Sequence, residues 1–172
     1  VLNKAIQEMA RGFADATSAR VEIQIAVITF GGDVARLHQD IVAASKFTWQ
    51  DMEAKGKTPL GSAFLIAKAL IEDKQKIPSR AYIPAIVLAS DARPTDTETT
   101  KDTVSWHDAL QELLSSERAS KAARYALAIG EDANLEVMRE FLADPNGKIF
   151  QANEIGEIHR FFRYVTMSVR TR

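Results

Sequence analysis

The chain has 172 residues, the size of one ordinary domain, and its 46% hydrophobic and 26% charged residues exclude an intrinsically disordered chain. Its net charge of −1, from 22 basic and 23 acidic residues, provides no positive field for non-specific nucleic-acid binding. With no cysteine, the chain has no disulfides, thiolate metal ligands or cysteine nucleophiles. No apolar stretch approaches the ~20 residues of a membrane helix. We therefore expect one domain over residues 1–172, in the cytoplasm, with no nucleic-acid or membrane partner.

The first residues have the spacing of an amphipathic helix. Leu2, Ile6, Met9 and Phe13 recur about once per helical turn. No Ser, Thr, Asp or Asn stands ahead of them to cap the first turn, so we expect a preceding segment that this sequence does not include.

Residues 21–30 alternate between apolar and polar side chains and then become wholly apolar. This pattern predicts a strand that is buried on both faces towards its carboxyl end. A glycine-rich turn follows at Gly31, Gly32 and Asp33. Residues 34–37 are expected to form a short return strand that closes a hairpin.

The rest of the chain alternates between helical and strand patterns. Helices are predicted from Thr58-Pro59 through Leu70 and around residues 106–114, 135–142 and 155–169, with strands at 83–89, 122–129 and 148–151. This order predicts an α/β fold with a doubly wound, mostly parallel sheet and one antiparallel edge strand. Ligands of such sheets bind where the strands end, which here means the loops after Phe30, Ala89 and Ile129.

Two oxygen-bearing side chains stand at this predicted crevice. Asp91 directly follows a buried strand, where its carboxylate could hold Mg²⁺ or accept a local backbone hydrogen bond. Thr58 stands at a helix start, where its hydroxyl could ligate a metal or cap the helix. Asp96, in the polar loop after Asp91, could form an acid/base pair with Asp91, but two nearby carboxylates in such a loop are more often solvated, and solvation is the expectation for Asp96. On the residues alone both interpretations of Asp91 stay open, whereas for Thr58 capping of the helix is favoured over metal ligation.

Signals for catalysis are missing. The triplet Gly56-Lys57-Thr58 resembles the end of a phosphate-binding loop, but Asp51 occupies the place of the required first glycine. The histidines His38, His107 and His159 lack metal-binding spacing, and no Gly-x-Ser-x-Gly elbow is present. The enzymatic alternative is a Mg²⁺-dependent phosphate-processing enzyme that uses Asp91 as ligand or nucleophile.

Segments of the chain, taken in order, resemble the von Willebrand factor A domain family, and most closely its TerY/YegL-like bacterial branch. They are the strand 27–30 with its glycine turn, the segment Gly56–Ala63, the strand and loop Ile86–Asp96, and the closing helix Phe161–Val169. Gly56–Ala63 is similar to the family's Gly-x-Thr-x-Leu-Gly-x-Ala segment. Ile86–Asp96 is similar to the family's strand that ends in Asp-Gly-x-Pro-Thr-Asp.

This resemblance implies a non-catalytic protein-interaction module with a metal-ion-dependent adhesion site, in which Mg²⁺ bridges the domain to an acidic group on a protein partner. Thr58 would be the hydroxyl ligand and Asp91 the carboxylate, acting through water. The expected partner-binding residues are Gly31, Gly32, Asp33, Gly56 and Arg93. The resemblance also implies a bacterial cytoplasmic protein of a tellurite- or stress-resistance system.

Two departures from the family pattern matter. The family's first strand and the Asp-x-Ser-x-Ser segment that follows it have no counterpart in this sequence, so the expected fold is incomplete at its N-terminus. We therefore expect Mg²⁺ binding by this chain to be weak or absent. Ala92 replaces the family's glycine after the aspartate, so a turn with positive φ there would be strained unless the loop has changed.

Overall fold

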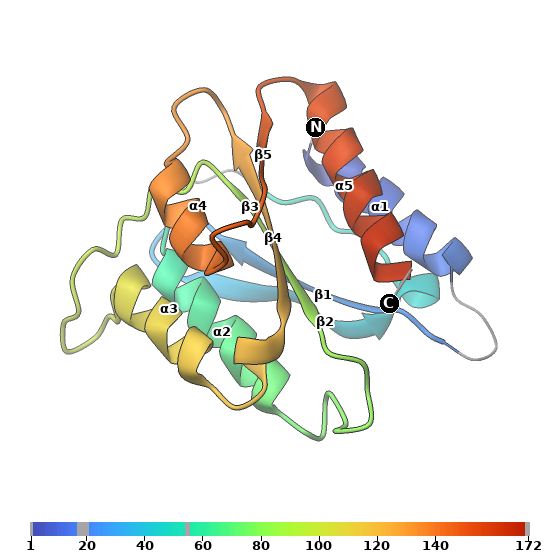
Figure 1. Cartoon of the computed structure of the whole chain (residues 1–172), viewed down its shortest axis with the longest axis horizontal. Helices are drawn as coiled ribbons and strands as arrows, with labels where there is room; N and C mark the ends of the chain where they lie inside the picture. Colours follow the sequence, from blue (N-terminus) through green and yellow to red (C-terminus); the bar gives the residue numbers. More distant parts are fainter. Residues whose placement is uncertain (1, 17–20, 54–55, 171–172) are drawn as a thin grey trace.

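The computed structural model describes residues 2–16, 21–53 and 56–170, and Figure 1 shows its helices and strands. In chain order the elements are α1 (Leu2–Ala16), β1 (Gln24–Phe30), β2 (Ala35–Ala43), η1 (Ala44–Lys46), α2 (Leu60–Glu72), β3 (Ala85–Ser90), α3 (Trp106–Ser115), η2 (Ala119–Lys121), β4 (Ala123–Ile129), α4 (Leu135–Leu142), β5 (Ile149–Ala152) and α5 (Ile155–Arg170). Every helix and strand predicted from the sequence is present, in the predicted order.

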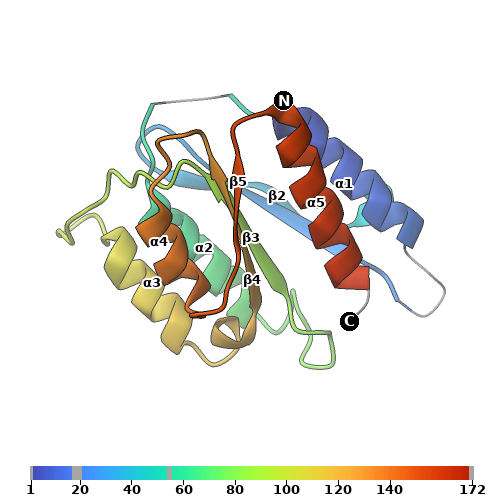
Figure 2. The ribbon, with the colours of Figure 1, turned by 45° about the horizontal axis from the view of Figure 1, so that its top comes forward.

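The strands form two hydrogen-bonded groups. β3, β4 and β5 make a three-stranded parallel sheet in that order, and β1 pairs antiparallel with β2. The α/β class, the parallel sheet and the antiparallel edge strand are confirmed. Within the described part of the chain no strand pairs with both β1 and β3, so the hairpin and the parallel sheet are separate hydrogen-bonded groups; Figure 2 shows β2 and the strands β3–β5 from a second side.

The return strand is longer than predicted, because β2 continues to Ala43. Its middle residues His38, Gln39 and Asp40 are polar and interrupt the apolar alternation on which the prediction rested. The strand forms one side of the hairpin and leaves much of its surface exposed, so it can carry polar residues there.

Helices cover both faces of the parallel sheet. On one face α2, α3 and α4 pack over Leu88, Ala126 and Ala128, and on the other α1 and α5 pack over Leu127 (Figure 1). Consecutive residues of β4 therefore point to opposite faces, as the strand period of two requires. Because both faces are covered, the strands have continuous apolar runs in the sequence.

Local capping explains where two of these helices begin. The Ser105 hydroxyl accepts a hydrogen bond from Asp108 N at 3.1 Å at the start of α3. The Asn134 side chain accepts from the backbone N of Glu136 and Val137 at 3.1 and 3.3 Å at the start of α4. No helix of the described residues has the length and apolarity that crossing a membrane requires.

The end of α4 carries a correctable strain. Ala143 follows the helix with φ 48° and ψ 34°, in the left-handed region, and its side chain is exposed. Glycine is the usual residue there, since a Cβ costs about 1–2 kcal/mol in this conformation.

We predict that Ala143→Gly raises the free energy of unfolding by about 1 kcal/mol, because it removes this strain and loses no buried contact. Ala69→Gly, at an exposed position inside α2, should lower it by about 0.5–1 kcal/mol and is the matched control. Urea unfolding measures both. A loss of stability in both variants would contradict the assignment of Ala143 to the left-handed region.

Candidate functional site

The carboxyl ends of β1 and β3 lie at one end of a large cavity. The cavity has a volume of about 2670 Å³ and is lined there by Gly31–Asp33 after β1, by Lys57 and Thr58 ahead of α2, and by Ser90 and Asp91 at the end of β3. The structure therefore places Thr58, Asp91, Gly31, Gly32 and Asp33 on one cavity. We call these five residues, together with Lys57, the rim.

Two loops of the rim are joined through Thr95. The Thr58 carbonyl accepts from Thr95 N at 3.0 Å, and the Thr95 hydroxyl oxygen accepts from Thr58 N at 3.1 Å. Because both backbone polar groups of Thr58 bond to this one residue, the segment ahead of α2 is fixed against the loop that follows Asp91.

Asp96, the residue after Thr95, also joins this loop to α2. Its side chain is only 8% exposed, and Oδ2 accepts from Gly61 N at 2.6 Å in the first turn of α2. Its other oxygen, Oδ1, is buried and has no hydrogen-bond partner within the described residues. Burial raises the pKa of Asp96, and the hydrogen bond from Gly61 N opposes that shift. The expectation that Asp96 is solvated is wrong, because the loop folds back over the start of α2.

Gly61 is required by the closeness of this packing. A Cβ on Gly61 would lie 2.7 Å from Val104 O, 2.8 Å from Asp96 Oδ2 and 2.9 Å from Ser105 O. Two of these atoms belong to backbone, so a larger residue would push α2 away from the loop that carries Asp96.

The expectation that Thr58 caps α2 is wrong. Pro59 occupies the cap position of α2 and makes no side-chain capping bond. The buried Asp96 carboxylate bonds the first-turn amide of Gly61 instead, so the Thr58 hydroxyl is not needed as a cap.

Asp91 is exposed at the rim, in a strained turn. Ala92, the next residue, has φ 52° although its side chain is fully buried, which confirms the expectation of a positive φ at an alanine. The Ser90 hydroxyl oxygen accepts from Ala92 N at 3.0 Å, and the Asp91 carboxylate accepts from Arg93 N at 3.3 Å. A left-handed alanine costs about 1–2 kcal/mol, so the surrounding packing holds this turn in place.

The charged residues nearby form exposed ion pairs. Lys57 Nζ lies 2.5 Å from Asp33 Oδ1, and the hydrogen bond and positive charge of Lys57 lower the pKa of Asp33. Arg93 is not part of the cavity lining, and its guanidinium donates to the Asp132 carbonyl at 2.6 and 2.9 Å. Gly56 is exposed and also lies outside the lining. Of the residues expected to bind a partner, Gly56 and Arg93 therefore do not line the cavity.

Comparisons with known proteins identify the architecture. No protein-family model matches the sequence, and no curated protein matches it. Two solved structures are similar. A von Willebrand factor type A protein from Catenulispora acidiphila matches 95% of this chain with a TM-score of 0.65 and 18% identity. Proximal thread matrix protein 1 from the mussel byssus matches 98% with a TM-score of 0.63 and 14% identity.

The chain has a von Willebrand factor A-like fold. It spans 37% of the length of the Catenulispora acidiphila chain and 41% of the byssus protein. Identities this low establish the fold alone. The structural likeness thus supports the family resemblance at the level of architecture.

The residues at the rim of this von Willebrand factor A-like fold do not by themselves fit a magnesium site. Mg²⁺ prefers about six oxygen ligands in an octahedron. The rim offers the Thr58 hydroxyl and the Asp91 carboxylate, while Asp33 is paired with an ammonium group. Across residues 2–16, 21–53 and 56–170, no group of three or more His, Cys, Asp or Glu side chains could hold a metal ion.

We predict that Asp96→Asn removes a pH dependence of stability, because it keeps an acceptor for Gly61 N and deletes the buried charge. A raised pKa means that the contribution of Asp96 is fully present below its unfolded pKa, near 3.8, and is lost as the pH rises through the folded value. The stability of the wild type relative to Asp96→Asn should therefore fall as the pH is raised from about 4 to 7.

Urea unfolding across this pH range measures the difference. Asp96→Ala is the control, since it leaves Gly61 N without a partner and should cost about 1–3 kcal/mol. Parallel pH profiles of the wild type and Asp96→Asn would contradict a raised pKa at Asp96.

Proposed function

We propose that this chain is a non-catalytic protein-interaction domain that contacts its partner with the rim. The observation that carries the proposal is the placement of Thr58 and Asp91 on one cavity by two loops that are hydrogen-bonded to each other. The exposed Asp91 carboxylate on these fixed loops suits recognition of a partner, because binding then costs little conformational entropy in the loops.

The arrangement of carboxylates favours binding over catalysis. Acid–base chemistry at Asp91 would need a second titratable group within hydrogen-bond reach of the same substrate. Asp96, the nearest carboxylate along this loop, lies buried against α2 and accepts from Gly61 N. It is therefore committed to structure and does not face a ligand at the rim.

An acidic group of the partner is proposed to meet the side chains of Lys57 and Arg93. These side chains are 62% and 58% exposed, and each lies in an ion pair with an aspartate that is itself exposed. Exposed ion pairs contribute only about 0–1 kcal/mol, so a partner carboxylate can exchange with Asp33 or Asp132 at low cost. Gly31, Gly32 and Gly56 leave the backbone around these cations open to a partner.

The finer expectations rest on the family resemblance. We propose a bacterial cytoplasmic protein of a tellurite- or stress-resistance system, on the similarity of Gly56–Ala63, Ile86–Asp96 and Phe161–Val169 to the TerY/YegL-like branch. We propose that Thr58 and Asp91 are its oxygen donors toward Mg²⁺, with low affinity because two donors are too few.

We predict that Asp91→Ala and Thr58→Ala each weaken partner capture at least tenfold without unfolding the protein. The immobilised chain and both variants are compared in capture from bacterial lysate, with circular dichroism as the check on folding. Glu117→Ala, an exposed acidic position after α3, is the matched control and should capture like the wild type. Equal capture by all four proteins would contradict the proposal that the rim contacts the partner.

We predict that millimolar Mg²⁺ leaves the thermal unfolding midpoint of this chain unchanged, because a ligand stabilises only in proportion to its occupancy. A Mg²⁺-dependent rise that Asp91→Ala abolishes would show a complete metal site. Mg²⁺-dependent hydrolysis of p-nitrophenyl phosphate that is lost in Asp91→Asn would instead favour the phosphate-processing alternative.

A further inference from the structure

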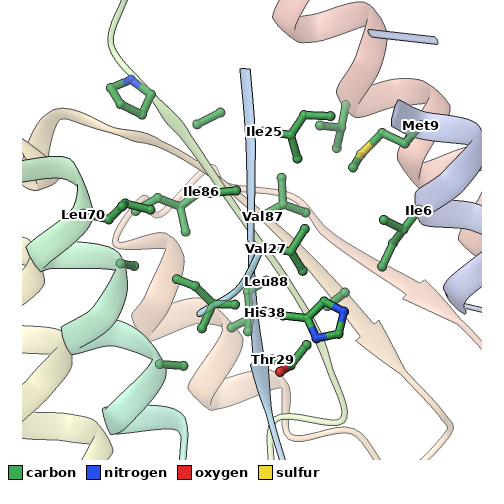
Figure 3. A pocket seen from close by; sticks show the side chains of 18 of the residues that line it. Ile6, Met9, Ile25, Val27, Thr29, His38, Leu70, Ile86, Val87 and Leu88 are labelled. Atoms are coloured by element: carbon green, nitrogen blue, oxygen red, sulfur yellow. The ribbon is translucent and has the colours of Figure 1, made fainter. Parts of the chain in front are cut away.

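The last helix, α5, packs against the rest of the molecule with one of its faces. Its apolar residues Phe161, Phe162 and Val165 are buried. Val165 also lines the cavity, toward which Ile6 and Met9 of α1 point (Figure 3). In Figures 1 and 2 α5 lies between β5 on one side and α1 on the other, so its remaining face is turned to solvent.

The solvent-exposed side of α5 carries arginine, tyrosine and methionine side chains. Residues at positions i, i+3, i+4, i+7 and i+10 share one side of an α-helix, because each turn takes about 3.6 residues. In α5 these are Arg160, Arg163, Tyr164, Met167 and Arg170, which we call the α5 face. All five are exposed, Tyr164 to 46% and Met167 to 61%. Aromatic residues, methionine and arginine are also the types that are enriched in protein–protein interfaces.

Neighbouring acids do not neutralise the positive charge of the α5 face. Among the ion pairs of the described residues, none involves Arg160, Arg163 or Arg170. Glu157 is the only acidic residue of α5. Its carboxylate accepts a hydrogen bond from Asn153 N at 2.7 Å, so it is already engaged at the start of the helix. The three guanidinium groups are therefore available to a ligand with negative charge.

Aromatic and basic side chains continue the α5 face over β5. The ring centroid of Tyr164 lies 4.8 Å from that of Phe150 in β5 and 6.2 Å from that of Tyr125 in β4. Lys148, directly ahead of β5, is exposed and places Nζ 4.5 Å from the centre of the Phe150 ring. Within the described residues β5 pairs with β4 alone, so this surface reaches the open edge of the parallel sheet.

The chemistry of this surface favours an acidic protein segment as its ligand. A guanidinium group binds a carboxylate through two parallel N–H···O hydrogen bonds. Apolar side chains of the same segment can pack on the exposed ring of Tyr164 and the thioether of Met167. Arg160 and Arg170 are separated by about 15 Å along the helix axis, a length that about three helical turns of a partner cover.

Two other anionic ligands fit this surface less well. The net charge of −1 gives the chain no long-range attraction for nucleic acid, and a phosphate backbone offers Met167 no apolar contact. A helix that lies on an anionic membrane inserts a broad apolar face. The apolar face of α5 is instead buried against the rest of the molecule, which leaves Tyr164 and Met167 as the apolar side chains of the α5 face.

We propose that the α5 face is a docking site for an acidic protein segment that carries aliphatic or aromatic side chains between its carboxylates. The arginines bind the carboxylates, and Tyr164 and Met167 contact the apolar side chains. Lys148 and Phe150 extend the site over β5. None of these residues belongs to the rim, so the proposal does not rest on the proposed function of the rim.

The test measures the binding of synthetic peptides to the chain by fluorescence anisotropy. The probes are twelve-residue peptides rich in glutamate, with leucine and phenylalanine at varied positions, and two matched sets replace glutamate by glutamine or the apolar residues by alanine. The best acidic peptide should bind at least tenfold more tightly than either of its counterparts, and added NaCl should weaken its binding. No binding by any acidic peptide, or equal binding by its glutamine counterpart, would overturn the proposal.

Variants on α5 test the location. Arg163→Glu should weaken binding of the best peptide at least tenfold and Met167→Ser at least threefold, with circular dichroism as the check on folding. Arg139→Glu is the matched control, since Arg139 is exposed on α4 at the other face of the sheet, and it should bind like the wild type. Equal binding by all these proteins, or a loss that follows Lys57→Ala at the rim instead, would overturn the placement on α5.

Two further probes test the class of ligand. A DNA duplex of 20 base pairs and vesicles that contain phosphatidylserine should each bind at least tenfold more weakly than the best acidic peptide at the same ionic strength. Tighter binding of either probe, lost in Arg163→Glu, would overturn the assignment of the α5 face to a protein segment.

Discussion

The hydrogen bond from Gly61 N to the buried Asp96 carboxylate, at 2.6 Å, is the contact on which the candidate site depends. It ties the first turn of α2 to the loop that follows β3. Thr95, the preceding residue of the same loop, bonds both backbone polar groups of Thr58. Burying a carboxylate with one oxygen unpartnered lowers the stability of the fold. The same carboxylate holds the loop after β3 against α2, and so keeps the rim in one arrangement.

The candidate site lies at the end of the sheet where two neighbouring strands finish. Thr58 and Asp91 lie where β1 and β3 end, and these are the two strands whose inner edges lack neighbours within the described residues.

The sequence predicted most of the fold because both faces of the parallel sheet are covered. Continuous apolar runs such as Ile86–Ala89 signal strands of this kind, and Ala92 in place of glycine correctly signalled a strained turn. Asp96 was missed, although α2 starts without a capping side chain and so needs an acceptor from elsewhere.

The central claim is that Thr58 and Asp91 converge on one rim, and cross-linking measures this most directly. The chain has no cysteine, so Thr58→Cys with Asp91→Cys creates a pair free of background. A short bifunctional thiol reagent should join the two in the native protein and not in urea. Ser79→Cys with Asp91→Cys, separated by the length of β3, should remain unlinked in the native state. Failure of the first pair to link in the native protein would contradict the account.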